Sequence, residues 1–265
     1  MGNDREALKR ELFAALASDS GSYSTPDGRI MSHHEIRELL QEWIPTGVFV
    51  KRRCDRTPSV VVAAPHVSFD NWTEYYANRV AHDLNCGEVL AKNFRDEDGG
   101  QIPVSIGRHI HVNRPTESKR RGEAEGVTPR AQAVFLQYRE ALAEAGGQQP
   151  LDLLIELHGH RRNLRLEVAT VGINQNVAAE LKDAYQNLAT GNAALPHLYI
   201  EPLDKLRFSA RRAKQNGSLT SGVCRAGLHI EIPRFCRENE TARRSFRPIL
   251  STWLLACIET QATRT

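Results

Sequence analysis

The chain has 265 residues, of which 40% are hydrophobic and 25% are charged, and its formal net charge is +3. This length suits one large α/β domain, or two small ones, with a sizeable core. The charge is too small to indicate a nucleic-acid partner by itself. Pairs of adjacent arginines occur at residues 52–53, 120–121, 161–162, 211–212 and 243–244. They are scattered along the chain with few aromatic residues beside them, unlike the stacking surfaces of single-strand binders. We therefore expect no nucleic acid among the partners.

The cysteines and the apolar runs bear on the compartment. Five cysteines occur and none form a Cys-X-X-Cys pair, which indicates neither a disulfide framework nor a cysteine zinc site and favours a reducing compartment. The first residues are polar, without an apolar stretch of signal length, and no run approaches the ~20 apolar residues of a membrane span. We expect a cytoplasmic protein with no membrane partner, and we leave the oligomeric state open.

Helical and strand-like patterns alternate along the chain. In chain order, apolar periodicity predicts helices over residues 4–17, 32–43, 71–84, 129–145, 175–189 and 248–261, and strands over 48–51, 60–64, 88–91, 109–112, 151–157, 164–170, 197–200 and 228–232. Ser32 and Glu35 have the spacing of a capping box, and Trp72 is expected among the inward-facing residues of its helix.

The remaining segments are turn-rich or polar. We expect loops over residues 18–28, 115–128 and 209–222, the second of them the best candidate for a mobile lid. The alternation of strands and helices predicts a largely parallel or mixed sheet with helices on both faces. We divide the chain into a helical extension over residues 1–45, packed on the core, and a single α/β domain over residues 46–265.

Two continuous apolar runs end at a histidine. Residues 59–64 lead to Pro65-His66, and residues 151–157 lead to His158. Runs of this kind are typical of strands buried on both faces, and in open α/β sheets chemistry collects where strands end. Asp70 follows His66 by four residues. Two imidazoles and a carboxylate suffice for one catalytic Zn²⁺ with an open fourth position. The alternative is a pair of unrelated histidines bonded to backbone groups.

His160 is a rival for His158, because strand alternation places both on one side of an extended chain. We prefer His158 since it directly terminates the apolar run, and we assign His160 to substrate contact or ligand orientation. A further carboxylate, Glu231, lies between two isoleucines, where burial is costly without a partner. It is either a solvated or Arg234-paired residue, or the general base of the site.

A third segment, residues 107–115, carries Arg108, Asn113 and Arg114. Guanidinium groups bind carboxylates through two parallel hydrogen bonds. Arg108 and Arg114 are therefore candidates for holding a substrate carboxylate or for polarising a scissile carbonyl, and Asn113 adds hydrogen bonds. Either arginine equally suits a structural ion pair.

Together these segments resemble the N-formylglutamate amidohydrolases, a branch of the wider zinc-carboxypeptidase and aspartoacylase group. The resemblance spans roughly residues 58 to 235. It is carried by the order of Pro65-His66 with Asp70 and Thr73, Val112-Asn113-Arg114-Pro115, Ile155-Glu156-Leu157-His158, and His229-Ile230-Glu231-Ile232-Pro233-Arg234.

The resemblance implies a zinc-dependent hydrolase on a three-layer α/β/α fold with a mixed central sheet. In its terms His66, Asp70 and His158 match the metal ligands, Glu231 matches the general base, Asn113 and Arg114 match the carboxylate-binding pair, and Arg108 matches an upstream arginine more loosely. The carboxypeptidase branch has its acidic ligand three residues after the histidine, so Glu74 is the alternative to Asp70. The segments after His66 and around His158 also depart from the amidohydrolase pattern, which bears on the substrate more than on the metal.

The expected reaction is hydrolysis of an amide bond in a small, anionic N-acylated or γ-glutamyl-type amino acid. Zinc would polarise the carbonyl and make hydroxide available at neutral pH. Glu231 would accept a proton, and Arg108 or Arg114 would stabilise the oxyanion. A metallocarboxypeptidase-like peptidase and a non-catalytic anion-binding protein on the same fold remain alternatives.

Overall fold

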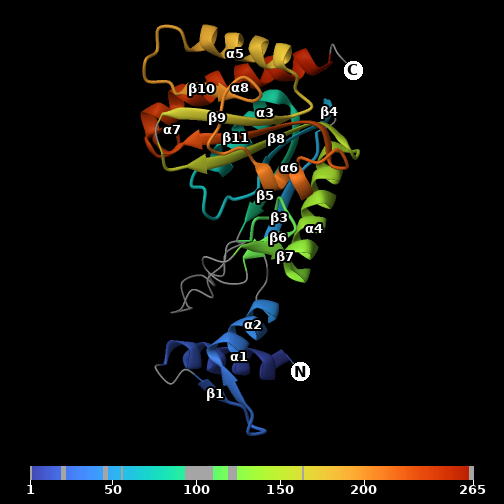
Figure 1. Cartoon of the computed structure of the whole chain (residues 1–265), viewed down its shortest axis with the longest axis vertical. Coiled ribbons are helices and arrows are strands. Elements are labelled where there is room, and N and C mark those ends of the chain that lie inside the picture. The colour runs from blue at the N-terminus through green and yellow to red at the C-terminus, as the bar shows by residue number, and fades with distance from the viewer. Residues whose placement is uncertain are drawn as a thin grey trace.

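The computed structural model describes residues 2–18, 22–43, 47–54, 56–92, 110–118, 124–162 and 164–262. These residues fold around a seven-stranded sheet with the order β10-β9-β11-β8-β4-β5-β3 (Figure 1). Its strands are β3 (Val48–Arg52), β4 (Thr57–Ala64), β5 (Cys86–Lys92), β8 (Leu151–His160), β9 (Arg165–Val171), β10 (His197–Ile200) and β11 (Cys224–Pro233).

The central strands of the sheet are parallel to one another, and the strands at both margins run antiparallel to them. Strands β11, β8, β4 and β5 run in one direction, whereas β3 is antiparallel to β5 and β9 is antiparallel to β11. At the far edge, β10 pairs parallel with β9. The mixed, largely parallel sheet predicted from the sequence is therefore confirmed.

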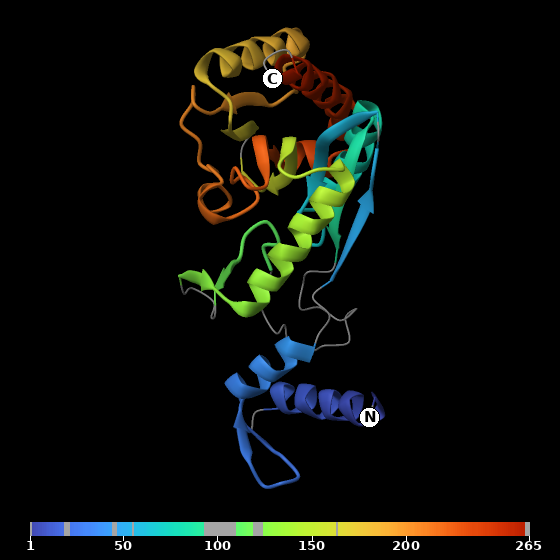
Figure 2. The same ribbon diagram turned by 90° about the vertical axis from the view of Figure 1, so that its right-hand side faces the viewer.

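Helices cover both faces of this sheet (Figures 1 and 2). Helices α3 (Thr73–Leu84), α5 (Gln175–Ala189) and α8 (Glu240–Ala262) share one hydrophobic cluster, and α4 (Pro129–Gly146) belongs to the other. Strand β4 feeds both clusters, because Val60 and Val62 point to the first while Val61 and Ala63 point to the second. This two-sided burial explains why the strand reads as an unbroken apolar run, and it confirms the three-layer α/β/α architecture.

Residues 2–43 form a small unit with an apolar cluster of their own. It contains α1 (Gly2–Ala17), β1 (Ser22–Ser24), β2 (Ile30–Ser32) and α2 (His33–Trp43). The capping box is confirmed, since the Ser32 backbone N–H donates to Glu35 at 2.8 Å and the Glu35 N–H donates to the Ser32 hydroxyl at 3.3 Å. Strand β1 occupies part of the loop expected over residues 18–28, and its partner β2 follows that loop. The packing of this unit on the α/β domain stays a prediction.

Several local predictions are wrong. Trp72 does not face inward: it precedes α3 with a φ of 71°, is 46% exposed, and lies under the Arg243 guanidinium at 3.5 Å from the ring centroid. The 115–128 segment contains a hairpin, β6 (Thr116–Ser118) and β7 (Glu125–Val127), and its mobility stays a prediction. The 209–222 segment contains the short helix α6 (Arg211–Asn216). Another short helix, α7 (Arg234–Glu238), follows β11.

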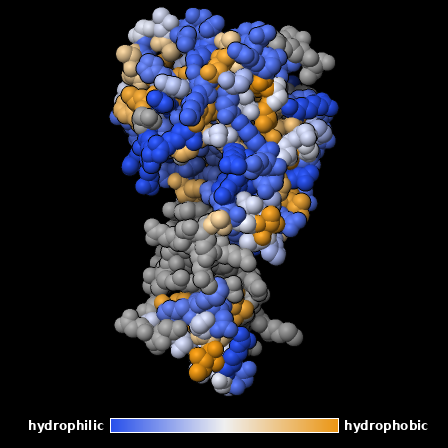
Figure 3. All heavy atoms as spheres, in the orientation of Figure 1, coloured by the Kyte–Doolittle hydropathy of each residue, from blue (hydrophilic) through white to orange (hydrophobic). Residues whose placement is uncertain are grey.

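Within the 109–112 segment, Ile110 to Val112 lie outside any strand, and residue 109 is outside the described residues. The face seen in Figure 3 is mostly hydrophilic, with hydrophobic residues lying singly or in small groups. Among the described residues, no helix is both long and apolar enough to cross a membrane.

Candidate metal centre and its surrounding network

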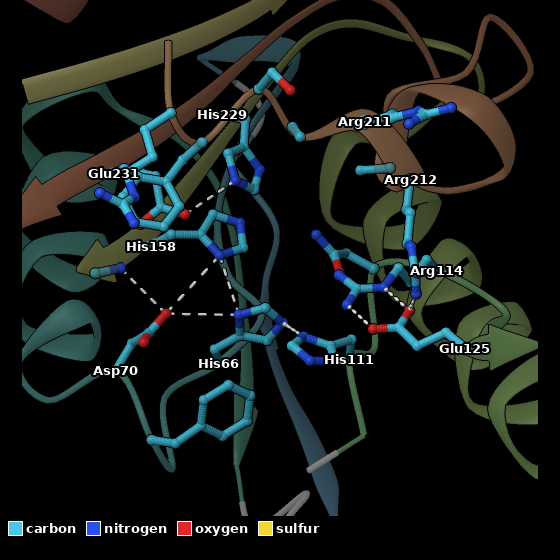
Figure 4. A pocket seen from close by; sticks show the side chains of 18 residues that line it. His66, Asp70, His111, Arg114, Glu125, His158, Arg211, Arg212, His229 and Glu231 are labelled. Carbon is cyan, nitrogen blue, oxygen red and sulfur yellow. Dashed lines mark hydrogen bonds and ion pairs between the residues drawn. The ribbon is translucent and has the colours of Figure 1, made fainter. Parts of the chain in front are cut away.

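Two neighbouring parallel strands bring the three predicted metal ligands together. His66 follows the end of β4, and His158 lies near the end of β8, which pairs with β4. After His66 the chain turns tightly, because the N–H groups of Phe69 and Asp70 both donate to the His66 carbonyl, at 3.1 and 2.7 Å. That turn returns the Asp70 carboxylate to the two imidazoles (Figure 4).

The three ligand atoms converge at the spacing that a metal ion requires. Nδ1 of His66 lies 3.1 Å from Nδ1 of His158, and Oδ2 of Asp70 lies 3.5 Å from the first nitrogen and 3.9 Å from the second. With zinc–ligand distances of 2.0–2.2 Å, a tetrahedral site places its ligand atoms about 3.3 Å apart. The donor set, two imidazole nitrogens and one carboxylate oxygen, therefore fits Zn²⁺ with one position left for a non-protein ligand.

The outer nitrogens of both histidines have partners that favour the metal-binding tautomer. His158 Nε2 faces Glu156 Oε2 at 3.4 Å, and His66 Nε2 faces His111 Nδ1 at 3.2 Å. A proton on each Nε2 satisfies those contacts and leaves each Nδ1 with a free lone pair. Burial also lowers the pKa of His66 well below its ordinary value, which keeps that ring neutral.

Glu156 is the centre of a buried network that the sequence did not reveal. Its side chain is fully buried, and it accepts from Asn113 Nδ2 at 3.2 Å and from the Tyr138 hydroxyl at 2.9 Å. His229 Nδ1 lies 3.4 Å from the same carboxylate, and its ring stacks on His158 with centroids 3.8 Å apart. Burial alone would raise the pKa of Glu156, but its hydrogen bonds with the two histidines hold that pKa well below its ordinary value.

Glu231 lies beside the candidate ligands, on the strand next to β8. The β11–β8 register pairs Glu231 with His158, and the Glu231 side chain is largely buried with Oε1 3.4 Å from His229 Nε2. Burial would raise the pKa of Glu231, yet its hydrogen bond with His229 lowers it to about 2. For His229 burial acts against the charge, while hydrogen bonds with Glu156 and Glu231 raise the pKa to about 9. Glu231 is therefore an ionised, buried carboxylate beside the centre.

Asp70 has a different electrostatic environment. Burial raises its pKa to about 6, because a carboxylate in a desolvated position loses hydration. Its Oδ2 also accepts from the Gly159 backbone N–H at 3.1 Å, which fixes the carboxylate against the end of β8. Glu74, the alternative acidic ligand, instead pairs with Lys92 and is absent from the three-residue cluster.

The predicted arginine site is already engaged by an internal carboxylate. Arg114 donates through Nε and Nη2 to the two oxygens of Glu125, at 2.9 and 2.8 Å. Arg212 of α6 forms an ion pair with the same Glu125 carboxylate. Arg108 lies outside the described residues, so its predicted role has no geometry to support it.

His160 is not brought to the candidate centre. Its Nε2 contacts the Arg165 carbonyl at 2.9 Å, and its Nδ1 accepts from the Arg162 backbone N–H at 3.1 Å. Both ring nitrogens are thus used by the turn that follows β8. Strand alternation predicts His160 on the same side of the chain as His158, but its hydrogen bonds with the turn keep the His160 ring away from the candidate metal ligands.

A buried arginine fastens the segments that carry the site. Arg237 of α7 is 3% exposed, and its guanidinium donates to the backbone carbonyls of Asn71, Ile232 and His160. These carbonyls come from the segments that follow Asp70, Glu231 and His158. Gly159 is required beside it, because a Cβ there would lie 2.3 Å from the Arg237 Cζ.

The candidate metal ligands open onto a cavity of about 410 Å³ (Figure 4). Its wall includes the three candidate ligands, the Glu231 and His229 side chains, and the Arg114–Glu125–Arg212 cluster on the opposite side. The volume is that of a small-molecule site. Asn113 is nearly fully buried in this wall, and its Oδ1 has no hydrogen-bond partner among the described residues.

Sequence reasoning missed His111, Glu156, Tyr138, Glu125 and Arg212. One of them carried a usable signal: Glu156 lies between apolar neighbours two residues before His158, so alternation places both side chains on one face of β8. The others come from a loop, a hairpin strand and two helices, whose approach to the site depends on the tertiary fold.

Comparison with known proteins finds solved structures with a similar fold. No protein-family model and no curated protein matches the chain. Similar solved structures include a zinc-free YndL (14% identity, 82% of this chain and 94% of that chain, TM-score 0.49) and a bacteriophage poly-gamma-glutamate hydrolase (14% identity, 86% and 94%, TM-score 0.46). A metallo-carboxypeptidase from Burkholderia cenocepacia is also similar (16% identity, 88% and 70%, TM-score 0.42). All three TM-scores lie below 0.5, so the function must be inferred from the geometry of the site itself.

Proposed function

We propose that this protein is a zinc-dependent hydrolase that cleaves an amide bond in a small N-acylated amino acid. The observation that carries the proposal is the convergence of His66 Nδ1, His158 Nδ1 and Asp70 Oδ2 to separations of 3.1 to 3.9 Å at one wall of a cavity. A buried carboxylate, Glu231, stands beside that group. Three protein ligands, an open position and an adjacent base are the parts of a hydrolytic zinc site.

His66, Asp70 and His158 would hold the ion, which supplies a Lewis acid and lowers the pKa of water at its open position. Glu231 is ionised, so it can accept a proton from the attacking water and pass it to the leaving nitrogen. Its carboxylate is oriented by His229. Glu156 fixes the tautomer of His158 from behind.

Asn113 and Arg114 supply substrate contacts on the other side of the cavity. The unpartnered Oδ1 of Asn113 suits an N–H donor of the substrate. Arg114 uses Nε and Nη2 on Glu125, and its Nη1 is the donor available for a substrate oxygen. The volume of about 410 Å³ favours a compact substrate over a folded protein.

The test combines metal analysis with a substrate screen. Purified full-length protein is expected to carry one zinc per chain and to hydrolyse members of a panel of N-formyl and N-acetyl amino acids. His66→Ala and His158→Ala are expected to lose zinc, because each removes one of three protein ligands. Glu231→Gln is expected to keep zinc and lose 10²-fold or more of kcat, on the order of a general base's contribution.

Glu88→Gln is the matched control, since Glu88 is another buried sheet carboxylate that pairs with Arg52 away from the cavity. A wild-type rate in Glu231→Gln would remove Glu231 from its role. Stoichiometric zinc with cleavage of peptides alone would favour the carboxypeptidase alternative. A protein that binds no zinc and cleaves nothing, yet holds small anions, would be a binding protein.

A further inference from the structure

The Glu125 carboxylate occupies the position that a substrate carboxylate would take on Arg114. Both guanidinium–carboxylate bonds are short, 2.9 and 2.8 Å, and they use the Nε–Nη2 edge side-on (Figure 4). The Thr116 hydroxyl donates to Oε2 of Glu125 at 3.0 Å, and Arg212 approaches the same oxygen. The two-bond geometry is the one in which arginine binds a free carboxylate most strongly.

This internal pair belongs to the cavity and not to the protein exterior. Arg114, Glu125 and Arg212 all line the cavity that holds the candidate metal ligands, and the side chains of Arg114 and Glu125 are each only 16% exposed. Arg114 follows Asn113, whose Oδ1 faces no described partner. A substrate that reaches His66 and His158 therefore meets an arginine whose carboxylate-binding edge is filled.

The charges at this wall point in the same direction. Two guanidinium groups share one carboxylate, so the cluster has a single net positive charge instead of two. Although burial opposes the charged form, hydrogen bonds and charge interactions with Arg114 and Arg212 lower the pKa of Glu125 to about 2, so it stays ionised at neutral pH. Glu125 both fills the two-bond edge of Arg114 and halves the positive charge available to an incoming anion.

We propose that Glu125 is a specificity-determining residue, which restricts Arg114 to one substrate oxygen at a time and so favours a carbonyl oxygen of an amide over a free carboxylate at this subsite. This inference rests on the proposed function, because the ligand of the cavity is a substrate only if the protein is a hydrolase. It deepens that function by assigning an uncharged, amide-bearing class to the Arg114 side of the cavity.

The test compares two probes that differ only in their terminal group, a carboxylate in N-acetyl-L-alanine and an uncharged carboxamide in N-acetyl-L-alaninamide. Their dissociation constants are measured by calorimetry on full-length wild-type protein and on Glu125→Gln; KM replaces the dissociation constant for any probe that is turned over. Removing the internal carboxylate frees the arginine edge, and a hydrogen bond to a charged group is worth about tenfold or more in affinity. We expect Glu125→Gln to shift the acid-to-amide affinity ratio toward the acid by about tenfold.

Glu117→Gln is the matched control. Glu117 lies in the same hairpin and pairs with Arg130 in the same manner, but it does not line the cavity. A general loosening of the hairpin would appear in both variants, whereas the proposed effect appears only in Glu125→Gln. Glu125→Asp, which keeps the charge but shortens the side chain, is expected to shift the ratio in the same direction by less.

An unchanged ratio in Glu125→Gln, or a shift toward the amide, would overturn the proposal and make Glu125 a positioning residue for Arg114. The two proposals fail separately. If wild-type protein cleaves neither probe but the ratio shifts as expected, the hydrolase assignment is weakened and the role of Glu125 stands. If cleavage occurs and the ratio does not shift, only the role of Glu125 is lost.

Discussion

Glu156 allows the sharpest test of how the buried network supports the metal centre. Four donors meet its carboxylate: Nε2 of His158, Nδ1 of His229, Nδ2 of Asn113 and the hydroxyl of Tyr138. The first three share Oε2, and the hydroxyl takes Oε1. Glu156→Gln keeps the shape and one acceptor oxygen, and the Tyr138 hydroxyl can rotate to accept from the new amide. The substitution therefore removes charge with little loss of packing.

The expected magnitude follows from this geometry. A neutral amide oxygen is a weaker hydrogen-bond acceptor than a carboxylate, so it polarises the Nε2–H of His158 less and makes Nδ1 a poorer metal ligand. Changes of this kind cost about 10- to 100-fold in metal affinity. Glu156→Leu is the severe counterpart, since it leaves all four donors without an acceptor. At about 1–3 kcal/mol each, the loss is about 4–12 kcal/mol, comparable with the entire stability of a domain. We expect that variant to fail to accumulate as folded protein.

The assay is zinc titration against a chromophoric chelator, with urea unfolding of the same samples. Asp152→Asn is the control, because Asp152 is on the same strand but pairs at the surface with Arg225, so it should change stability by less than about 1 kcal/mol. The reasoning fails if Glu156→Gln binds zinc within about twofold of wild type. It also fails if Glu156→Leu folds with wild-type stability.

Two further predictions concern stability. Thr128 is the N-cap of α4 and accepts from the Ala131 N–H at 3.1 Å, so Thr128→Ala should lower the free energy of unfolding by about 1 kcal/mol in urea titration; no change would mean that the cap is dispensable. Arg237→Lys replaces a planar fork with a point charge that cannot reach all three carbonyls, and we expect a loss of about 2 kcal/mol and weaker zinc binding. Arg234→Lys on the same short helix, where the arginine pairs with Glu238 at the surface, should behave as wild type. Equal losses in both variants would argue against the role of the three Arg237–carbonyl hydrogen bonds.

The layers of the fold could be predicted from the sequence because β4 and β8 are buried on both faces. Each has an apolar run bounded by turn residues, and such a run is typical of a central strand that is covered on both faces. The segments outside these central strands were harder to predict. The hairpin at Thr116 and the short helix at Arg211 are polar segments stabilised by tertiary contacts, such as the Arg212–Glu125 pair, which no local pattern records.

The same contrast explains the site. His66 and His158 lie at the ends of adjacent parallel strands, so the pairing of these strands is enough to bring the two histidines together. Arg114 was expected to face the substrate. The order of residues along the chain cannot show that Glu125, eleven residues later, binds the Nε and Nη2 atoms of Arg114 with its carboxylate. Glu231 was identified as a carboxylate within an apolar strand, and Glu156 satisfies the same criterion but was read only as part of an apolar run.

The balance of buried charge gives a reason for a divalent ion at this place. Glu156 and Glu231 are buried carboxylates, Asp70 is a partly buried one, and His229 is the cation that contacts the first two. The buried Arg237 guanidinium also interacts with Asp70 and Glu231, and the three carboxylates still exceed these two cations by one negative charge when all are ionised. Uncompensated buried charge is expensive, and the raised pKa of Asp70 expresses that cost. A dication between the Nδ1 atoms and Oδ2 of Asp70 removes the excess where the three ligand atoms already converge, whereas a neutral ligand there would leave it in place.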